Sequence, residues 1–211
     1  MKSGKVKNFF NKLWFLLWKD NSFKGWIFSL IFIFVFIKFL FFPFLSLVTG
    51  TSLPLAIVES CSMYHQGNVF SDFNSWFQRH ELKYSELNIT ESQFHQFSLL
   101  NGFSKGDILF IVGVKPQNIR IGDVIIYNAG QQAPIIHRVI NITKENGTYF
   151  FSTEGDNNNG QLSFENGINQ NQILGKASFT IAPFIGWVKL VFYEGQKPAD
   201  QRGFCTETPS S

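Results

Sequence analysis

Three short polar stretches carry the residue types that nucleophilic catalysis requires: Glu59–Met63, Pro134–Val139 and Glu154–Asn158. Taken singly, a serine after a helix exit, a histidine in an apolar strand and a Gly-Asp-Asn turn all have ordinary structural explanations. Taken together, they supply a hydroxyl nucleophile, a base to accept its proton and a carboxylate to fix the tautomer of that base. The combination predicts a Ser-His-Asp hydrolytic site, whereas the chain order of the three carries no information because unrelated folds realise one geometry in different orders.

The elements that must position these residues are predicted to be short strands. Apolar, β-branched runs alternate with Lys-Pro, Gly-Gln-Gln and Glu-Asn-Gly turns, which are hairpin signals. No helical pattern separates the runs, and this disfavours a doubly wound fold. The sequence therefore predicts a mostly β protein with a small antiparallel β domain, whose strands lie in 106–114, 121–129, 134–143, 148–156 and 172–181.

The other segments after residue 48 are less regular. An extended run over 55–59 precedes the first polar stretch, and residues 66–103 are polar and aromatic, which indicates an inserted helical or irregular subregion. The apolar segment 181–195 is broken by Pro183 and Gly186, so it is too short to span a membrane. We expect it to be a final strand or a contact with the membrane surface.

An N-terminal membrane anchor is predicted over residues 26–48. Eight phenylalanines lie in this stretch, which is long enough as a helix to cross about 30 Å of hydrocarbon. Lys38 costs roughly 2.5–3.5 kcal/mol at the centre of such a helix, which the apolar run outweighs. Pro43 marks either a kink or the exit from the helix.

Charge predicts the orientation of this anchor. Residues 1–25 hold six lysines and one acidic residue, and after Val48 the first basic residue is Arg79. The positive-inside rule therefore puts the N-terminus in the cytoplasm and the large domain outside. A cleaved signal peptide fits poorly, because the apolar run is longer than the ~7–15 residues of such a core and an Ala-x-Ala-like site is missing at its end. The stretch 9–18 suggests a helix in the membrane interface or a packing helix in the cytoplasm.

The predicted organisation is a basic cytoplasmic or interfacial segment over 1–25, a transmembrane helix over 26–48, a β-rich extracytoplasmic domain over 49–195 and a tail over 196–211. Because the basic residues adjoin an apolar stretch instead of forming a folded face, nucleic acid is not an expected partner. The two cysteines cannot build a framework of several disulfides and leave the compartment open.

Five motifs in order resemble those of type I signal peptidases: Ser60–Met63, Gly106–Leu109, Gly122–Ile125, Pro134–Val139 and Gly155–Asn158. The resemblance covers roughly residues 50–190. It is to the archaeal and endoplasmic-reticulum branch, in which a histidine stands where most bacterial members carry a lysine. The family implies a membrane-bound serine endopeptidase that removes signal peptides from exported preproteins after small residues, at Ala-x-Ala-like sites.

The resemblance also assigns roles to single residues. Ser62 matches the nucleophile, His137 the general base and Asp156 the acidic partner. Ser60 matches the residue whose hydroxyl forms the oxyanion hole together with the backbone N–H of Ser62. The chemistry implied is attack of the Ser62 hydroxyl on the scissile carbonyl, followed by hydrolysis of an acyl-enzyme.

The chain departs from the family pattern in two places. A short link between the first two motifs is replaced by residues 64–105, and a second aspartate that many members carry after Gly-Asp-Asn is missing. Glu165 is a candidate substitute for that aspartate. Cys61 invites a thiolate-nucleophile alternative, which is disfavoured because no His or Lys adjoins it in sequence.

Partners follow from the resemblance and the predicted topology. We expect preprotein signal peptides, the lipid bilayer and the protein-export translocon, in the cell membrane or, in a eukaryote, the endoplasmic-reticulum membrane with a lumenal domain. Trp187 is expected to help hold the site at the membrane. No cofactor or metal is expected, because the remaining histidines, His65, His80 and His95, lack ligand-like spacing. Sequons begin at Asn88, Asn141 and Asn146.

Two alternatives compete with the enzyme. One is a catalytically silent membrane-anchored β module that binds exported chains or serves as a subunit of a processing complex, which the missing aspartate and the insertion favour. The other is a self-cleaving repressor-type peptidase, which the histidine and the membrane helix disfavour.

Overall fold

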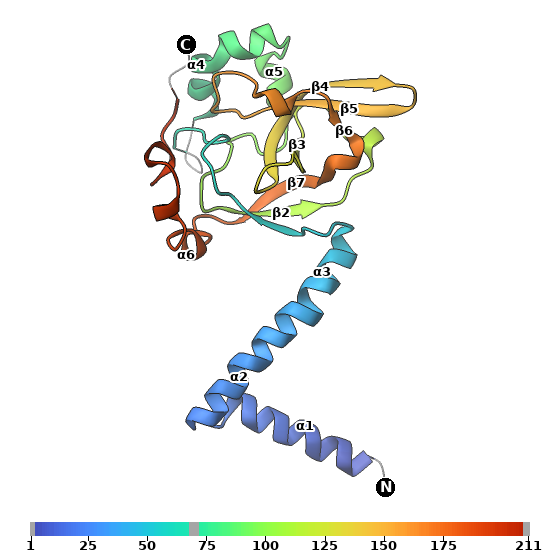
Figure 1. Ribbon diagram of the computed structural model, residues 1–211, viewed down its shortest axis with the longest axis vertical. Helices are drawn as coiled ribbons and strands as arrows, with labels where there is room; N and C mark the ends of the chain where they lie inside the picture. Colours follow the sequence, from blue (N-terminus) through green and yellow to red (C-terminus); the bar gives the residue numbers. More distant parts are fainter. Residues whose placement is uncertain (1–2, 68–71, 209–211) are drawn as a thin grey trace. The chain divides into compact units, whose positions relative to one another are not determined.

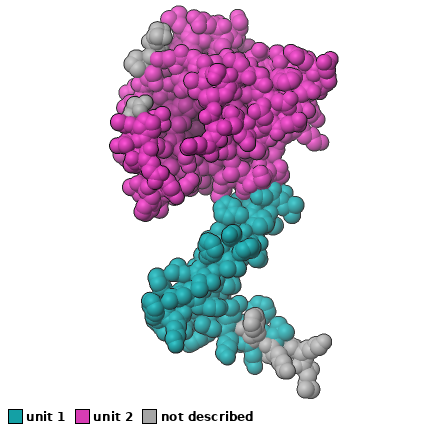
Figure 2. Space-filling model, viewed as in Figure 1, with its two compact units in different colours: residues 1–48 teal, residues 49–211 magenta. Residues whose placement is uncertain are grey.

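The computed structural model describes residues 3–67 and 72–208. The chain divides into two compact units, Met1–Val48 and Thr49–Ser211 (Figure 2).

The first unit is helical. Helix α1 covers Ser3–Trp18, and after a turn α2 (Phe23–Phe36) starts at Ser22, whose hydroxyl accepts the N–H of Gly25 at 3.1 Å. A π-helical turn over Ile37–Phe41 joins α2 to α3 (Phe42–Thr49). Among the described residues, the continuous helix Phe23–Thr49 is the candidate membrane span, since its 27 residues are long and apolar enough to cross a bilayer.

The π turn explains how Pro43 fits inside this helix. Proline lacks an N–H and its ring clashes with the carbonyl four residues earlier, so the preceding turn must widen. The Phe42 N–H donates to the carbonyl of Ile37, a spacing of five residues. Of the two alternatives for Pro43, the helix exit is wrong, because the helix continues to Thr49. Lys38 lies in the widened turn near the rings of Phe34 and Phe39.

The second unit is built on an antiparallel sheet, as predicted (Figure 1). Within the described part of the chain the sheet has seven strands in the order β1-β2-β7-β3-β4-β5-β6. Their bounds are β1 Leu55–Ile57, β2 Ile108–Val112, β3 Val124–Tyr127, β4 Ile135–Glu145, β5 Thr148–Glu154, β6 Ile168–Asn169 and β7 Ile173–Ala182. The two-residue strand β6 gives no sequence pattern and was not predicted.

The centre of this sheet is β3, whose four residues are all buried. It pairs with β4 along one edge and with β7 along the other. Its side chains alternate between the two faces of the sheet, and those on each face belong to a hydrophobic cluster. The pairing sets Ile125 opposite His137. The predicted base thus lies on an ordered interior strand and not on a loop.

The insertion over 66–103 contains helices α4 (Phe73–Glu86) and α5 (Glu91–Phe94) in its described part. Asp72 caps α4, and Thr90 and Gln93 form a capping box on α5. The buried face of α4 packs with α5 in a largely aromatic cluster made of Phe73, Trp76, Phe77, Tyr84, Ile89, Phe94 and Ile140. Because Ile140 belongs to β4, this cluster fixes the insertion to the sheet.

The segment after β7 is helical, so the expectation of a final strand there is wrong. Helix α6 spans Trp187–Leu190, and Pro183 together with the turn at Gly186 ends the strand before it. The Trp187 indole N–H donates to the carbonyl of Lys105 at 3.0 Å. Trp187 is therefore a packing residue, and its exposed apolar neighbours are Val188, Val191 and Phe192.

The aromatic cluster yields a test of how much the insertion contributes to stability. Phe94→Ala removes a fully buried ring (0% exposed), and such truncations cost about 3–5 kcal/mol of unfolding free energy. We expect this loss in urea unfolding of the detergent-solubilised chain. Leu82→Ala is the control because Leu82 is 76% exposed on the same insertion, and its effect is expected within about 0.5 kcal/mol. Equal effects of the two variants would contradict the role given to the cluster.

Candidate active site

Ser62 and His137 meet in the structure, although they lie far apart in the chain. Ser62 follows β1 in a turn, and His137 lies on β4. The Oγ of Ser62 is 2.8 Å from Nε2 of His137. This is the separation that a general base needs to take the proton of a nucleophilic hydroxyl.

Glu165 provides the carboxylate on the other side of the imidazole. Its Oε1 lies in hydrogen-bond contact with Nδ1 of His137, and the side chain is completely buried. Glu165 ends a 3₁₀ turn over Ser163–Glu165, in the link between β5 and β6. A carboxylate at Nδ1 holds the proton there and leaves Nε2 free to accept from Ser62.

Ser62 opens onto a groove of about 1060 Å³. One wall is formed by β1 and the residues after it, and the other by the start of β4 and the loop before it. Ser60 lies in the same groove with its Oγ 3.1 Å from that of Ser62, which is a position open to a developing oxyanion.

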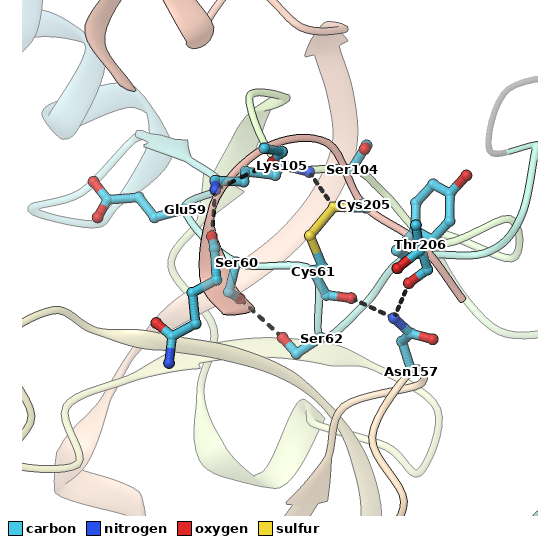
Figure 3. Close-up of a disulfide and its surroundings, with 12 residues drawn as sticks. Glu59, Ser60, Cys61, Ser62, Ser104, Lys105, Asn157, Cys205 and Thr206 are labelled. Carbon is cyan, nitrogen blue, oxygen red and sulfur yellow. Dashed lines mark hydrogen bonds between the residues drawn. A yellow bond between two sulfur atoms is a disulfide. The ribbon is translucent and has the colours of Figure 1, made fainter. Parts of the chain in front are cut away.

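The residue between the two serines is tied to the C-terminal segment. Cys61 forms a disulfide with Cys205 over a separation of 144 residues, with the Cα atoms 5.3 Å apart (Figure 3). Because both sulfurs are bonded, Cys61 has no thiolate to act as a nucleophile. Sequence reasoning missed this bond, since two cysteines give no pattern that pairs them.

The backbone around Ser62 is held by the Gly-Asp-Asn turn. The Asn157 N–H donates to the carbonyl of Ser62 at 2.8 Å, and the Asn157 side chain donates to the carbonyl of Cys61 at 3.0 Å. A Cβ at position 155 would lie only 2.7 Å from the Ser62 carbonyl oxygen, so this close approach requires Gly155. The Gly-Asp-Asn turn therefore holds the backbone of Cys61 and Ser62 in place.

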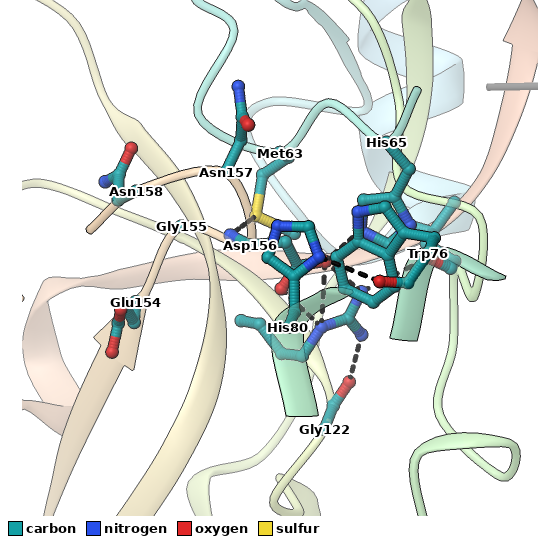
Figure 4. Close-up of polar contacts among 12 residues, drawn as sticks. Met63, His65, Trp76, His80, Gly122, Glu154, Gly155, Asp156, Asn157 and Asn158 are labelled. Carbon is teal, nitrogen blue, oxygen red and sulfur yellow. Dashed lines mark hydrogen bonds and ion pairs between the residues drawn. The ribbon is translucent and has the colours of Figure 1, made fainter. Parts of the chain in front are cut away.

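Asp156 lies in a buried ion pair with Arg138, next to His65 (Figure 4). It accepts from Arg138 Nη2 at 2.7 Å and Nε at 2.9 Å. Nε2 of His65 lies 2.9 Å from the same carboxylate, and the Tyr84 hydroxyl donates to it at 3.1 Å. All four side chains are 0–1% exposed.

The expectation that Asp156 is the partner of His137 is therefore not met by this geometry. Its carboxylate pairs instead with Arg138, the residue directly after His137. The place beside His137 belongs to Glu165, the substitute considered for the missing aspartate. Motif position alone misassigned the carboxylates because the turn and the 3₁₀ segment present their side chains to different sides of β4.

The charges in this cluster explain two pKa shifts. Burial alone raises the pKa of Asp156, but the Arg138 guanidinium and the hydrogen bonds from His65 and Arg138 bring it well below its usual range. Burial lowers the pKa of His65, against the opposing pull of Asp156. A neutral His65 that donates from Nε2 fits its Nδ1, which has no hydrogen-bond partner among the described residues.

The other histidines and acidic residues have structural environments. Trp76 is stacked between the rings of His65 and His80, at centroid distances of 3.5 and 4.6 Å. Asp107 and Asp123 accept backbone N–H groups in their turns. The described part of the chain holds no group of three His, Cys, Asp or Glu side chains placed to bind a metal ion. The three sequon asparagines, Asn88, Asn141 and Asn146, are exposed.

The chain is similar to proteins named signal peptidase complex catalytic subunits. It is 30% identical to human SEC11C over 107 residues, which are 47% of this chain and 55% of that protein. The resemblance to signal peptidases is confirmed. The Dictyostelium discoideum sec11 protein is 31% identical over 104 residues, covering 46% of this chain and 57% of that protein. The Candida tropicalis SEC11 protein is 32% identical over 103 residues, covering 46% and 61%.

The chain thus spans little more than half the length of these signal peptidase relatives. No family model matches it.

The buried ion pair predicts a strong effect of Asp156 on stability. Asp156→Asn leaves the Arg138 guanidinium buried without its countercharge, which costs about 3–5 kcal/mol of unfolding free energy at pH 7. Urea unfolding of the full chain in detergent measures this. Glu81→Gln, at an exposed position of α4, is the control and is expected to change little. A cost below about 1 kcal/mol for Asp156→Asn would contradict the argument.

The same cluster predicts a loss of stability in acid. Below about pH 6.5 the unfolded chain binds a proton at His65 that the folded chain excludes, and below about pH 4 it binds one at Asp156 as well. Unfolding free energy should therefore fall in two windows as pH decreases. The window below pH 4 should shrink in Asp156→Asn, and an unchanged acid profile in that variant would argue against the assignment.

Proposed function

We propose that this chain is a membrane-anchored serine endopeptidase of the signal peptidase I type, which removes signal peptides from exported preproteins after small residues. The observation that carries the proposal is the hydrogen-bonded series Ser62–His137–Glu165, of which Ser62 and His137 line an open groove. The resemblance to signal peptidase catalytic subunits supports the substrate class.

In the proposed reaction His137 takes the Ser62 proton at Nε2 as Oγ attacks the scissile carbonyl. The backbone N–H of Ser62 and the hydroxyl of Ser60 stabilise the oxyanion. His137 then gives its proton to the leaving amine, an acyl-enzyme remains, and a water activated by the same imidazole hydrolyses it. Glu165 keeps the proton on Nδ1 and stabilises the imidazolium, while Asp156 takes no part in proton transfer.

The free edge of β1 is the proposed docking site for the substrate backbone. Val58 exchanges backbone hydrogen bonds with Asp107 and Gly106 on the β2 side. Since backbone groups alternate along a strand, those of Leu55 and Ile57 face the groove and can pair with an extended peptide. Apolar groove residues such as Phe103 and Ile126 then limit the space for side chains next to the cleaved bond.

The outer location of the domain is also a proposal. The Cys61–Cys205 disulfide supports it, because such bonds persist in oxidising compartments. The lysines before the anchor support the same orientation by the positive-inside rule. The translocon remains an expected partner that delivers the preprotein.

The silent-module alternative loses its main support in this geometry. It was favoured by a missing aspartate, but Glu165 supplies a buried carboxylate at His137. A role as the catalytic subunit of a complex stays open, and the relatives carry that name. For a repressor-type peptidase a lysine would have to stand where His137 contacts Ser62.

Cleavage of a labelled preprotein with an Ala-x-Ala site tests the catalytic assignment. Ser62→Ala and His137→Ala should each lower kcat/KM by about 10⁴-fold or more. Glu165→Gln should lower it by about 10²–10⁴-fold, because Gln cannot stabilise the imidazolium. Rates are measured on the purified full chain in detergent, with circular dichroism to verify folding.

Asp156→Asn is the matched control for Glu165→Gln, since both neutralise one buried carboxylate. We expect Asp156→Asn to lower the free energy of unfolding but to change kcat much less than Glu165→Gln does. Rates are measured at a temperature where Asp156→Asn remains folded. A variant Asp156→Asn that loses more activity than Glu165→Gln would reverse the two assignments. An inert wild type, or activity retained in Ser62→Ala, would overturn the enzyme proposal.

Exposed apolar side chains around α6 are proposed to contact the lipid surface near the cleavage point. Val191 and Phe192 are 62% and 77% exposed. The double variant Val191→Ser/Phe192→Ser should cut a bilayer-embedded preprotein about 10-fold more slowly but a short soluble peptide at the wild-type rate. Leu82→Ser, at a 76% exposed position of α4, is the control. Equal loss on both substrates would contradict the lipid contact.

A further inference from the structure

The C-terminal segment Gln196–Thr208, called here the strap, lies against the nucleophile turn and not free in solvent. Its first anchor is Lys105, which is 1% exposed. The Lys105 ammonium group donates to the carbonyl of Gln201 at 2.8 Å and pairs with Glu194 at 2.7 Å. A buried ammonium group needs such partners, so this anchor holds the start of the strap without help from the disulfide.

The second anchor is the side chain of Asn157. Its amide nitrogen donates both to the carbonyl of Cys61, at 3.0 Å, and to that of Thr206, at 3.1 Å. Its oxygen accepts the N–H of Thr208 at 2.8 Å, while its own backbone N–H holds the carbonyl of Ser62. The side-chain amide of Asn157 therefore joins the strap to the backbone of Cys61, directly before Ser62 (Figure 3).

The third anchor is covalent and falls between the two serines of the site. Cys205 of the strap is bonded to Cys61, with Ser60 before it and Ser62 after it. The turn that carries these serines has left β1, so the sheet ladder no longer holds it. Water can replace the hydrogen-bond partners in the first two anchors, but it cannot replace the covalent bond of the third.

The strap also contributes to the groove itself. Lys197 and Gln201 line it together with Ser60 and Ser62. The Lys197 ammonium group donates to the carbonyl of Glu59 at 2.6 Å. The strap thus limits the groove at the end next to the cleavage point.

We propose that the strap is a positioning device that keeps the Ser62 hydroxyl in register with His137, with the Cys61–Cys205 disulfide as its fastening. This inference rests on the proposed peptidase function. Cys61, Cys205 and Asn157 act through the backbone of Ser62 and do not touch the substrate's reacting atoms. Cleavage activity then depends on the redox state of this one bond.

The size of the effect follows from the geometry of catalysis. A displacement of about 1 Å at a catalytic group costs roughly 10²-fold in rate. Loss of the fastening frees the turn and weakens the Asn157 anchor, whereas the Lys105 anchor stays in place. The expected result is a fall in kcat of about 10–100-fold with KM changed less than about threefold.

The experiment compares the oxidised full chain in detergent with the same protein treated with dithiothreitol. The reagent gives two electrons and two protons to the disulfide, which becomes two thiols while the reagent closes to its own cyclic disulfide. We expect kcat to fall on reduction and to recover on reoxidation. Cys61→Ser/Cys205→Ser is the matched control, with the low kcat under both conditions and no response to the reagent.

Hydrogen exchange gives a readout that does not depend on activity. Reduction should speed exchange at the N–H groups of Asn157 and Thr208, which close the contacts between strap and turn, and leave β3 and β4 protected. An unchanged kcat in Cys61→Ser/Cys205→Ser overturns the proposal. So does a loss of protection throughout the domain, which would make the bond a general stabiliser.

Failure of the function and failure of the strap are distinguishable. If the oxidised wild type is as inactive as Ser62→Ala, the proposed peptidase function fails, and exchange at Asn157 still reports on the strap. If the oxidised wild type cleaves and reduction changes neither kcat nor exchange, the strap alone is wrong.

Discussion

The buried ion pair between Asp156 and Arg138 is the constraint on which the rest of the site depends. Arg138 follows the proposed base on β4, and its guanidinium also donates to the carbonyls of Ser98 at 2.8 Å and Gly122 at 2.9 Å. The pair thus joins the Gly-Asp-Asn turn, the insertion and the turn before β3. A buried guanidinium demands all of these acceptors, so the segments cannot move independently.

The insertion is part of this arrangement. Lys83 of α4 donates to the carbonyls of Gly155 and Asn158, both at 2.8 Å, and pairs with Glu154 at 2.9 Å. These contacts hold the turn that in turn holds the carbonyl of Ser62. The insertion therefore helps to hold the backbone of Ser62 through this turn. The aromatic cluster around Phe94 in turn fixes the insertion to the sheet.

The two buried carboxylates Asp156 and Glu165 make different contacts. Asp156 is held by a guanidinium and keeps the backbone in place, whereas Glu165 contacts the imidazole. This division explains how a chain without the second aspartate of its motif retains a complete Ser-His-carboxylate series. Glu165 contacts His137 from a 3₁₀ turn that lies beyond the motif.

The elements that have local sequence signals could be predicted from the sequence. Alternating apolar runs predicted β2, β3, β4, β5 and β7, a Phe-rich run predicted the apolar helix, and motifs identified Ser62 and His137 as a pair. The tertiary structure was needed to show which carboxylate meets His137, that Cys61 bonds Cys205, and that His65 and Tyr84 both contact Asp156. These contacts join residues 28 to 144 positions apart. No local pattern specifies such partners, because they depend on how the sheet and the insertion pack together.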